Sequence, residues 1–94
     1  MKNNELGFLY FACSDIRPSV ISQIGYIPEY MDALRNLKND GVYIDSQTVF
    51  QTVKDVYHMV FENNKGNSKY RSARQIMNKL SSDLYGDPHA WQYK

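Results

Sequence analysis

The chain has 94 residues and 43% of them are hydrophobic, so it has room for one globular domain whose core needs no disulfide. Its single cysteine, Cys13, excludes an internal disulfide framework and a multi-cysteine zinc site, and it favours a reducing, cytoplasmic location. Eleven lysines and arginines against ten acids give a formal net charge of +1. Any attraction for nucleic acid or another charged partner must therefore be local.

The most hydrophobic run is residues 6–13, within a first helix expected over about residues 4–16. This run is too short for a membrane span, which needs about 20 apolar residues. It also lacks the basic flank and the cleavage site of a secretory signal. We therefore expect a buried helix or strand at the start of the domain and no association with a membrane.

Residues 18–41 carry apolar side chains at helical spacing: Val20, Ile24, Ile27, Met31 and Leu34. Pro28 interrupts this pattern. A proline has no N–H to donate and disfavours the helical conformation in the residue before it. The segment is therefore predicted to kink at Pro28 or to stop and start again there.

The clearest amphipathic pattern runs over residues 45–63, where four valines fall on one helical line: Val49, Val53, Val56 and Val60. Asp45 or Ser46 is a suitable N-cap. A last helix is predicted over residues 68–85, ended by Gly86 and Pro88.

These patterns predict an all-α fold: one small domain over residues 1–86 with about four helices, as an antiparallel bundle or a compact orthogonal array. Residues 87–94 are predicted to be a C-terminal tail. We expect the tail's Trp91, the only tryptophan, to dock on its own domain or on a neighbouring subunit, because its ring gains free energy by burial.

A local excess of positive charge marks residues 63–82, which hold five cations and no acid: Lys65, Lys69, Arg71, Arg74 and Lys79. On the last helix Lys69, Tyr70, Arg71, Arg74 and Asn78 form a candidate binding surface, hereafter the contact ridge. Such a ridge can grip phosphates with Tyr70 stacking on a base, or it can pair with an acidic protein surface. A solvated helix face is the third interpretation.

The eight tyrosines are too numerous for all of them to be buried with satisfied hydroxyls. Tyrosine is favoured at protein interfaces. We therefore expect a homo-oligomer, with Trp91 and Tyr93 as apolar anchors.

An alternative hypothesis places a helix-turn-helix over residues 17–38, with Gly25 at the turn and Pro28 opening the second helix. Its DNA contacts would come from Tyr30, Arg35, Asn36 and Lys38. A helix broken at Pro28 inside a bundle explains the same spacing.

Signals for catalysis are weak. His58 and His89 lack the spacing of a zinc site, Cys13 sits in a hydrophobic run where thiols are usually inert, and the glycines are isolated. We therefore predict no enzyme activity, no metal and no cofactor.

The resulting hypothesis is a small, non-enzymatic protein that binds a macromolecular partner stoichiometrically, as a regulator, an inhibitor or an immunity factor of a phage or mobile element would. A protein partner is favoured over nucleic acid. The helix-turn-helix DNA-binding regulator is the alternative, and a small-ligand binder or an enzyme is the third hypothesis.

Overall fold

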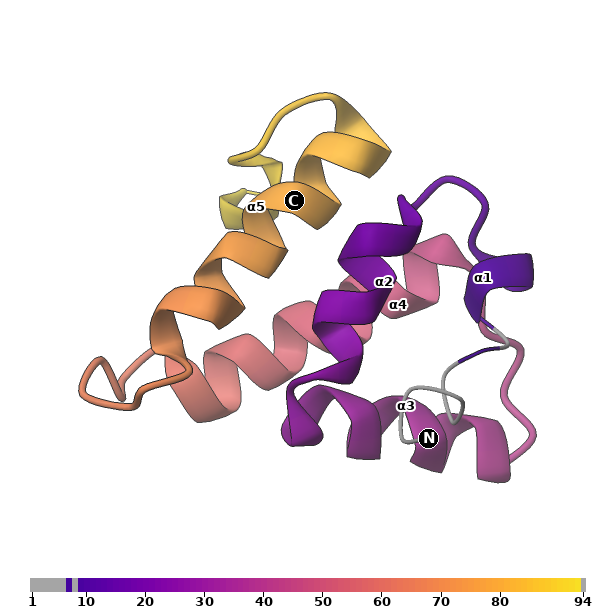
Figure 1. Ribbon diagram of the computed structural model, residues 1–94, viewed down its shortest axis with the longest axis horizontal. Helices are drawn as coiled ribbons and strands as arrows, with labels where there is room; N and C mark the ends of the chain where they lie inside the picture. The colour runs from indigo at the N-terminus through magenta and orange to yellow at the C-terminus, as the bar shows by residue number, and fades with distance from the viewer. Residues whose placement is uncertain (1–6, 8, 94) are drawn as a thin grey trace.

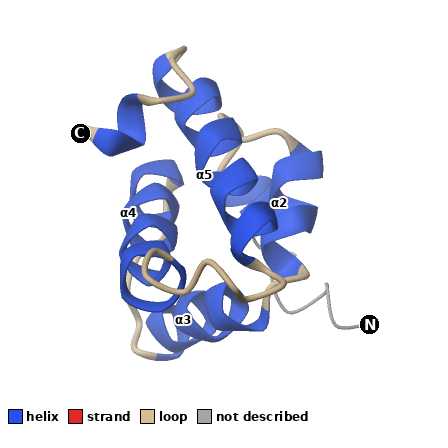
Figure 2. Cartoon of the chain, turned by 90° about the vertical axis from the view of Figure 1, so that its left-hand side faces the viewer, coloured by secondary structure: helices blue, strands red, loops and turns tan. Residues whose placement is uncertain are grey.

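The computed structural model describes Gly7 and residues 9–93 and confirms the predicted all-α fold. Four helices of two turns or more build it: α2 (Pro18–Gly25), α3 (Pro28–Asn39), α4 (Ser46–Val56) and α5 (Tyr70–Tyr85). No strand occurs within these described ranges. The four helices cross one another, with α3 along the lower edge of Figure 1 and α2 rising steeply from it, as Figures 1 and 2 show. Of the two expected architectures, the compact array therefore describes the arrangement better.

The first predicted helix is much shorter than expected. α1 (Leu9–Ala12) is a single turn, closed by the Cys13 N–H, which donates to the carbonyl oxygen of Leu9 at 2.9 Å. Residues 4–6 and 8 of the predicted helix lie outside the described residues. Cys13 and Ile16 follow as irregular but buried chain before Pro18 opens α2.

Pro28 separates two helices, as predicted. It is the first residue of α3, where a missing N–H costs nothing, and Ile27 before it is extended with φ −109° and ψ 108°. The turn itself lies at Tyr26 and Ile27, whereas Gly25 is still the last residue of α2. The ring of Tyr26 is 72% exposed, so its size is no obstacle to the turn.

α4 begins at the predicted N-cap, because the Asp45 carboxylate accepts a hydrogen bond from the Thr48 N–H at 2.9 Å. The helix then widens into one π-helical turn, η2 (Tyr57–Phe61), in which the Glu62 N–H donates to the Tyr57 carbonyl oxygen at 2.8 Å. The predicted valine line holds at Val49 and Val53. Beyond them Tyr57 and Phe61 enter the core, whereas Val56 and Val60 are half-buried.

The predicted C-terminal tail folds back against α5 over residues 87–93. α5 ends at Gly86, which has a φ of +72°, a conformation that favours glycine. The chain then turns back into the short helix η3 (Ala90–Gln92), where the Trp91 N–H donates to the Ser81 hydroxyl at 2.9 Å. Trp91 is only 3% exposed, so it docks on its own domain.

One continuous core joins all of these elements and brings distant parts of the chain together. The Asp83 carboxylate of α5, for example, accepts from the Arg17 N–H and contacts the Arg17 side chain, both at 3.1 Å, at the start of α2. None of the helices over the described residues has the length and hydropathy to cross a membrane.

Candidate functional site

Two neighbouring surface hollows lie where the first turns of α5 meet η2 and η3. The first, of about 390 Å³, is called the η2 hollow and is lined by Tyr57, His58, Glu62, Asn63, Lys65, Tyr70, Arg74, Trp91 and Gln92. The second, of about 450 Å³, is called the α5 hollow and is lined by Lys65, Asn67, Ser68, Tyr70, Arg71, Arg74, Gln75 and Asn78. Lys65, Tyr70 and Arg74 line both hollows, so these two depressions form one continuous candidate site.

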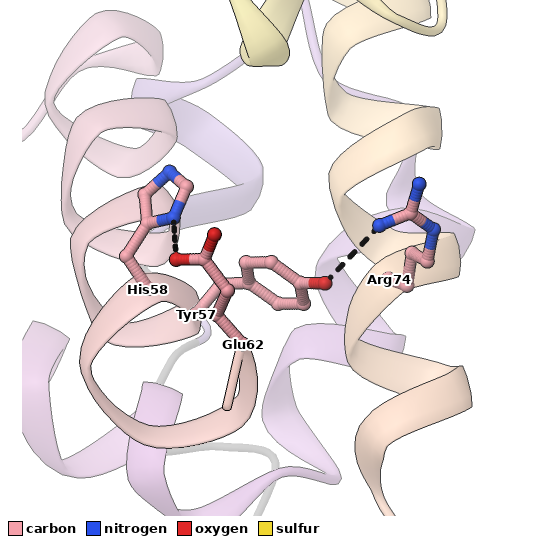
Figure 3. A network of polar contacts seen from close by, with 4 residues as sticks. All are labelled: Tyr57, His58, Glu62 and Arg74. Atoms are coloured by element: carbon pink, nitrogen blue, oxygen red, sulfur yellow. Dashed lines mark hydrogen bonds and ion pairs between the residues drawn. The ribbon is translucent and has the colours of Figure 1, made fainter. Parts of the chain in front are cut away.

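Arg74 occupies the centre of this site, in a fixed position. Its Nη1 donates to the Tyr57 hydroxyl at 3.2 Å, and its guanidinium carbon lies 5.4 Å from the centre of the Trp91 ring. Figure 3 shows the Tyr57 phenol reaching from η2 across to Arg74 on α5. A hydrogen bond and a cation–π contact thus hold the guanidinium of this partly buried residue in place.

The surroundings of Tyr57 shift the pKa of its hydroxyl group. Burial raises the pKa of Tyr57, hydrogen bonding with Tyr70 raises it further, and Arg74 opposes both effects. The pKa of Arg74 is raised as well, mainly by its hydrogen bond with Tyr57. The Tyr57 phenol therefore stays protonated at neutral pH beside a permanent positive charge.

Glu62 is engaged on the other side of the η2 hollow. Its Oε1 lies 2.7 Å from Nδ1 of His58, and Figure 3 shows this carboxylate beside the imidazole, on the η2 side of the hollow. Among the described residues, no carboxylate pairs with Arg74. The acid that lines the η2 hollow with Arg74 is thus bound to another group.

No protein-family model, curated protein or solved structure matches this chain.

Tyr70, Arg71 and Arg74 of the predicted contact ridge line the α5 hollow together. Lys69 also faces outward, but its Nζ lies 3.4 Å from the Glu29 carboxylate of α3, which offsets part of its charge. Asn78 is already used within the fold, because its Oδ1 accepts from the Trp91 indole N–H at 2.8 Å. Lys65, from the loop before α5, completes the positive surface.

The two expected anchors, Trp91 and Tyr93, differ in their exposure. Trp91 is buried against Tyr57, with ring centres 5.1 Å apart, so it is an intramolecular anchor and cannot meet a partner as an exposed ring. Tyr93 is 69% exposed, and its hydroxyl donates to the Asp87 carboxylate. Of the two, only Tyr93 remains available for an interface.

The candidate DNA-contact residues are not all accessible. Tyr30 is 0% exposed and packs edge-to-face on Phe61 with ring centres 5.8 Å apart, so it cannot reach a base. Arg35 pairs with Asp32 on the same helix. Asn36 and Lys38 are exposed on α3. The α2–turn–α3 geometry therefore exists, but burial removes the aromatic contact on which the DNA hypothesis relied.

Sequence periodicity missed the η2 side of the site. His58 was considered only as a possible zinc ligand, yet its ring lies 5.6 Å from the centre of the Tyr57 ring and 6.1 Å from that of Trp91. Tyr57 and His58 belong to the π turn η2, a feature often found at functional sites. In the sequence, the run of five cations in residues 63–82 indicated only the α5 side of the site.

The remaining reactive side chains stand apart from the hollows. Cys13 is buried, and its burial raises the pKa of its thiol. Within residues 9–93, no group of three or more histidine, cysteine or acidic side chains could hold a metal ion. The chemistry that the site offers directly is the binding of an anion by a guanidinium, an ammonium and phenol hydroxyls.

Proposed function

We propose that this protein acts by stoichiometric, non-enzymatic binding of a protein partner that presents an acidic surface to the first turns of α5. The contacts would come from Arg71, Arg74 and Lys65, with Tyr70 between them. Occlusion of the partner's surface, as a regulator, inhibitor or immunity factor achieves it, is the mechanism that suits so small a domain.

The α5 hollow is the observation that carries this proposal. Three of its lining residues are cations, and the described lining includes no acid. Arg71 lacks an ion pair or hydrogen bond among the described residues, and Arg74 is held in place by Tyr57 and Trp91. A pre-organised arginine loses little side-chain entropy when it pairs with a carboxylate, which favours binding.

An acidic protein fits this charge distribution better than nucleic acid does. A nucleic-acid-binding domain more often has a strongly basic face, whereas this chain has a formal net charge of only +1. Acids also border the basic surface, because Glu62 lines the η2 hollow and Glu29 pairs with Lys69. A long phosphate backbone would meet these carboxylates, but a compact acidic patch on a protein need not.

The proposal is tested by fluorescence anisotropy with a labelled oligoglutamate peptide, a labelled DNA duplex and an oligolysine peptide at the same salt concentration. We expect saturable binding of oligoglutamate alone. The double variant Arg71→Ala, Arg74→Ala should weaken it strongly. The double variant Lys38→Ala, Lys54→Ala removes the same charge elsewhere and should leave binding almost unchanged.

Two results would overturn the proposal. Equal losses in both double variants would mean that only net charge matters. Tighter binding of the duplex, with a log–log salt slope of about −0.7 to −0.9 per phosphate contact, would assign the ridge to nucleic acid instead.

A further inference from the structure

The Arg74 guanidinium is held in position by its neighbours but has unused hydrogen-bonding capacity. An arginine side chain has five N–H donors. Over the described residues, Nη1 donates to the hydroxyl of Tyr57, the guanidinium carbon lies 5.4 Å from the centre of the Trp91 ring, and the Tyr70 hydroxyl shares in raising the pKa of Arg74. The donors that remain can pair with an anion that accepts two N–H bonds at once.

The two phenols beside Arg74 are suited to the same anion. A neutral tyrosine hydroxyl both accepts and donates, so Tyr57 accepts from Arg74 and can direct its own proton either to Tyr70 or to a bound anion. Tyr70 stands beside both groups at the boundary between the two hollows. The η2 hollow thus brings together one guanidinium and two hydroxyls on a single opening.

The charge of the lining selects the class of anion. Apart from His58, which bonds to Glu62, Lys65 and Arg74 provide two positive charges and Glu62 one negative charge, which leaves one positive charge. A single carboxylate neutralises that charge. A phosphate dianion would add a second negative charge close to Glu62, which like-charge repulsion disfavours.

We infer that the η2 hollow receives one carboxylate group, bound by the guanidinium of Arg74 and the hydroxyls of Tyr57 and Tyr70. The inference deepens the proposed function and rests on it for the source of the group, which is the acidic protein partner. The carboxylate can belong to an aspartate or glutamate side chain or to the partner's C-terminus, since both present the same planar pair of oxygens.

The only tryptophan provides a local reporter for this site, because Arg74 lies over its ring and its indole N–H is bonded to Asn78. The experiment follows the indole cross-peak in ¹H–¹⁵N spectra of the full chain. It titrates N-acetylglycine, which mimics a C-terminus, and the α-amide of N-acetylglutamate, which mimics an acidic side chain. N-acetylglycinamide serves as the uncharged control, and inorganic phosphate as the competing anion.

We expect a saturable shift with at least one carboxylate probe, none with the amide, and weaker binding of phosphate. Arg74→Gln should reduce affinity about tenfold or more, since it removes a charge-assisted hydrogen bond. Arg71→Gln is the matched control: it lies one turn earlier on α5, does not line the η2 hollow, and should retain the shift. Glu62→Gln should tighten carboxylate binding, because it removes the repelling charge.

Tyr57→Phe and Arg74→Lys keep most of the packing, so a loss of carboxylate binding in these variants is not explained by misfolding. Far-UV circular dichroism checks that they are folded. Both should weaken binding severalfold. The inference is overturned if no carboxylate probe saturates, if phosphate binds more tightly, or if Arg71→Gln weakens binding as much as Arg74→Gln. The carboxylate site and the proposed function can fail separately. Oligoglutamate binding that depends on Arg71 but not on Arg74 would support the contact ridge as a binding surface and reject the carboxylate site.

Discussion

The guanidinium of Arg74 lies over the ring of Trp91, 5.4 Å from its centre, although 17 residues separate the two in the chain. This contact joins the candidate binding surface to the hydrophobic core, because the same ring is 3% exposed and packs on Tyr57. Positioning of the ridge therefore depends on docking of the C-terminal segment. Changes at Trp91 should alter both the stability of the fold and the geometry of the site.

Trp91 should be one of the most costly residues to truncate. Trp91→Ala is expected to lower the free energy of unfolding by about 3–5 kcal/mol, as for other large buried aromatic residues. Asn78→Ala leaves the indole N–H without its acceptor and should cost about 1–3 kcal/mol. Urea unfolding followed by circular dichroism measures both. Gln92→Ala, at an exposed neighbouring position, should change stability by less than about 0.5 kcal/mol.

Tyr30→Phe should stabilise the protein. The Tyr30 side chain is fully buried, and its hydroxyl has no hydrogen-bond partner among the described residues, an arrangement that costs about 1–3 kcal/mol. Removing the oxygen should recover about 1 kcal/mol of that cost while the ring keeps its contact with Phe61. Denaturant titration at pH 7 tests this, with the exposed Tyr43→Phe as control. A loss of stability would mean that the hydroxyl is hydrogen-bonded after all.

The same variant should reduce sensitivity to alkaline pH. Burial, aided by the neighbouring Tyr57 and Glu29, raises the pKa of Tyr30 in the folded protein. As the pH rises, the unfolded chain therefore loses this proton first, at about pH 10. The contribution of the Tyr30 proton to the free energy of unfolding is fully present below that pH and falls as the pH rises further. In Tyr30→Phe the urea midpoint should fall less between pH 9 and 11, with the remaining loss coming in part from Tyr57, whose pKa is also raised. An unchanged slope would contradict this assignment.

The N-cap of α4 predicts an acid-sensitive contribution at Asp45. The hydrogen bond from the Thr48 N–H lowers the pKa of this carboxyl, so its stabilisation is present above the pKa of an unfolded aspartate and is lost as pH falls through the lower folded value. Asp45→Ala should lower the melting temperature at pH 7, whereas Asp45→Asn, also a good cap, should lower it less. At pH 2.5 the gap between wild type and Asp45→Asn should narrow or reverse.

Cys13 should react slowly with thiol reagents. It is 1% exposed, and burial raises the pKa of its thiol above the ordinary value, with a hydrogen bond to Ser46 partly opposing that effect. Labelling with Ellman's reagent at pH 8 should therefore be slow in the folded protein and fast in urea. Equally fast labelling in both conditions would show that the segment around α1 opens readily.

Self-association stays a prediction, and the exposure of Tyr93 makes it the residue at which to test it. Light scattering should give a mass above 11.0 kDa at micromolar concentration. Tyr93→Ala should lower that mass without affecting the fold, because Tyr93 is exposed while Trp91 is not. Deleting residues 87–94 should instead destabilise the domain, because the deletion removes Trp91 from the hydrophobic core. A strict monomer would refute the anchoring role of Tyr93.

Local effects explain why the helix boundaries could be predicted. Pro28, Gly86 and the capping carboxylate of Asp45 each act on residues close to them in the chain, so their effects on the helix ends can be predicted from the sequence. The basic segment and the burial of Trp91 were predictable for a similar reason, since they follow from residue type and spacing.

The site itself depends on contacts between residues far apart in the chain. The π turn at Tyr57, the Arg74–Trp91 contact and the bond from Trp91 to Asn78 form only when η2, α5 and η3 pack together. Periodicity assigns residues to a face of one helix but does not specify which neighbouring element covers that face. Residue order therefore determined the helices and the local charge, whereas tertiary packing decided that Arg74 is a fixed cation without a carboxylate partner among the described residues. Helical propensity is a short-range property, but the burial of a charge depends on the whole fold.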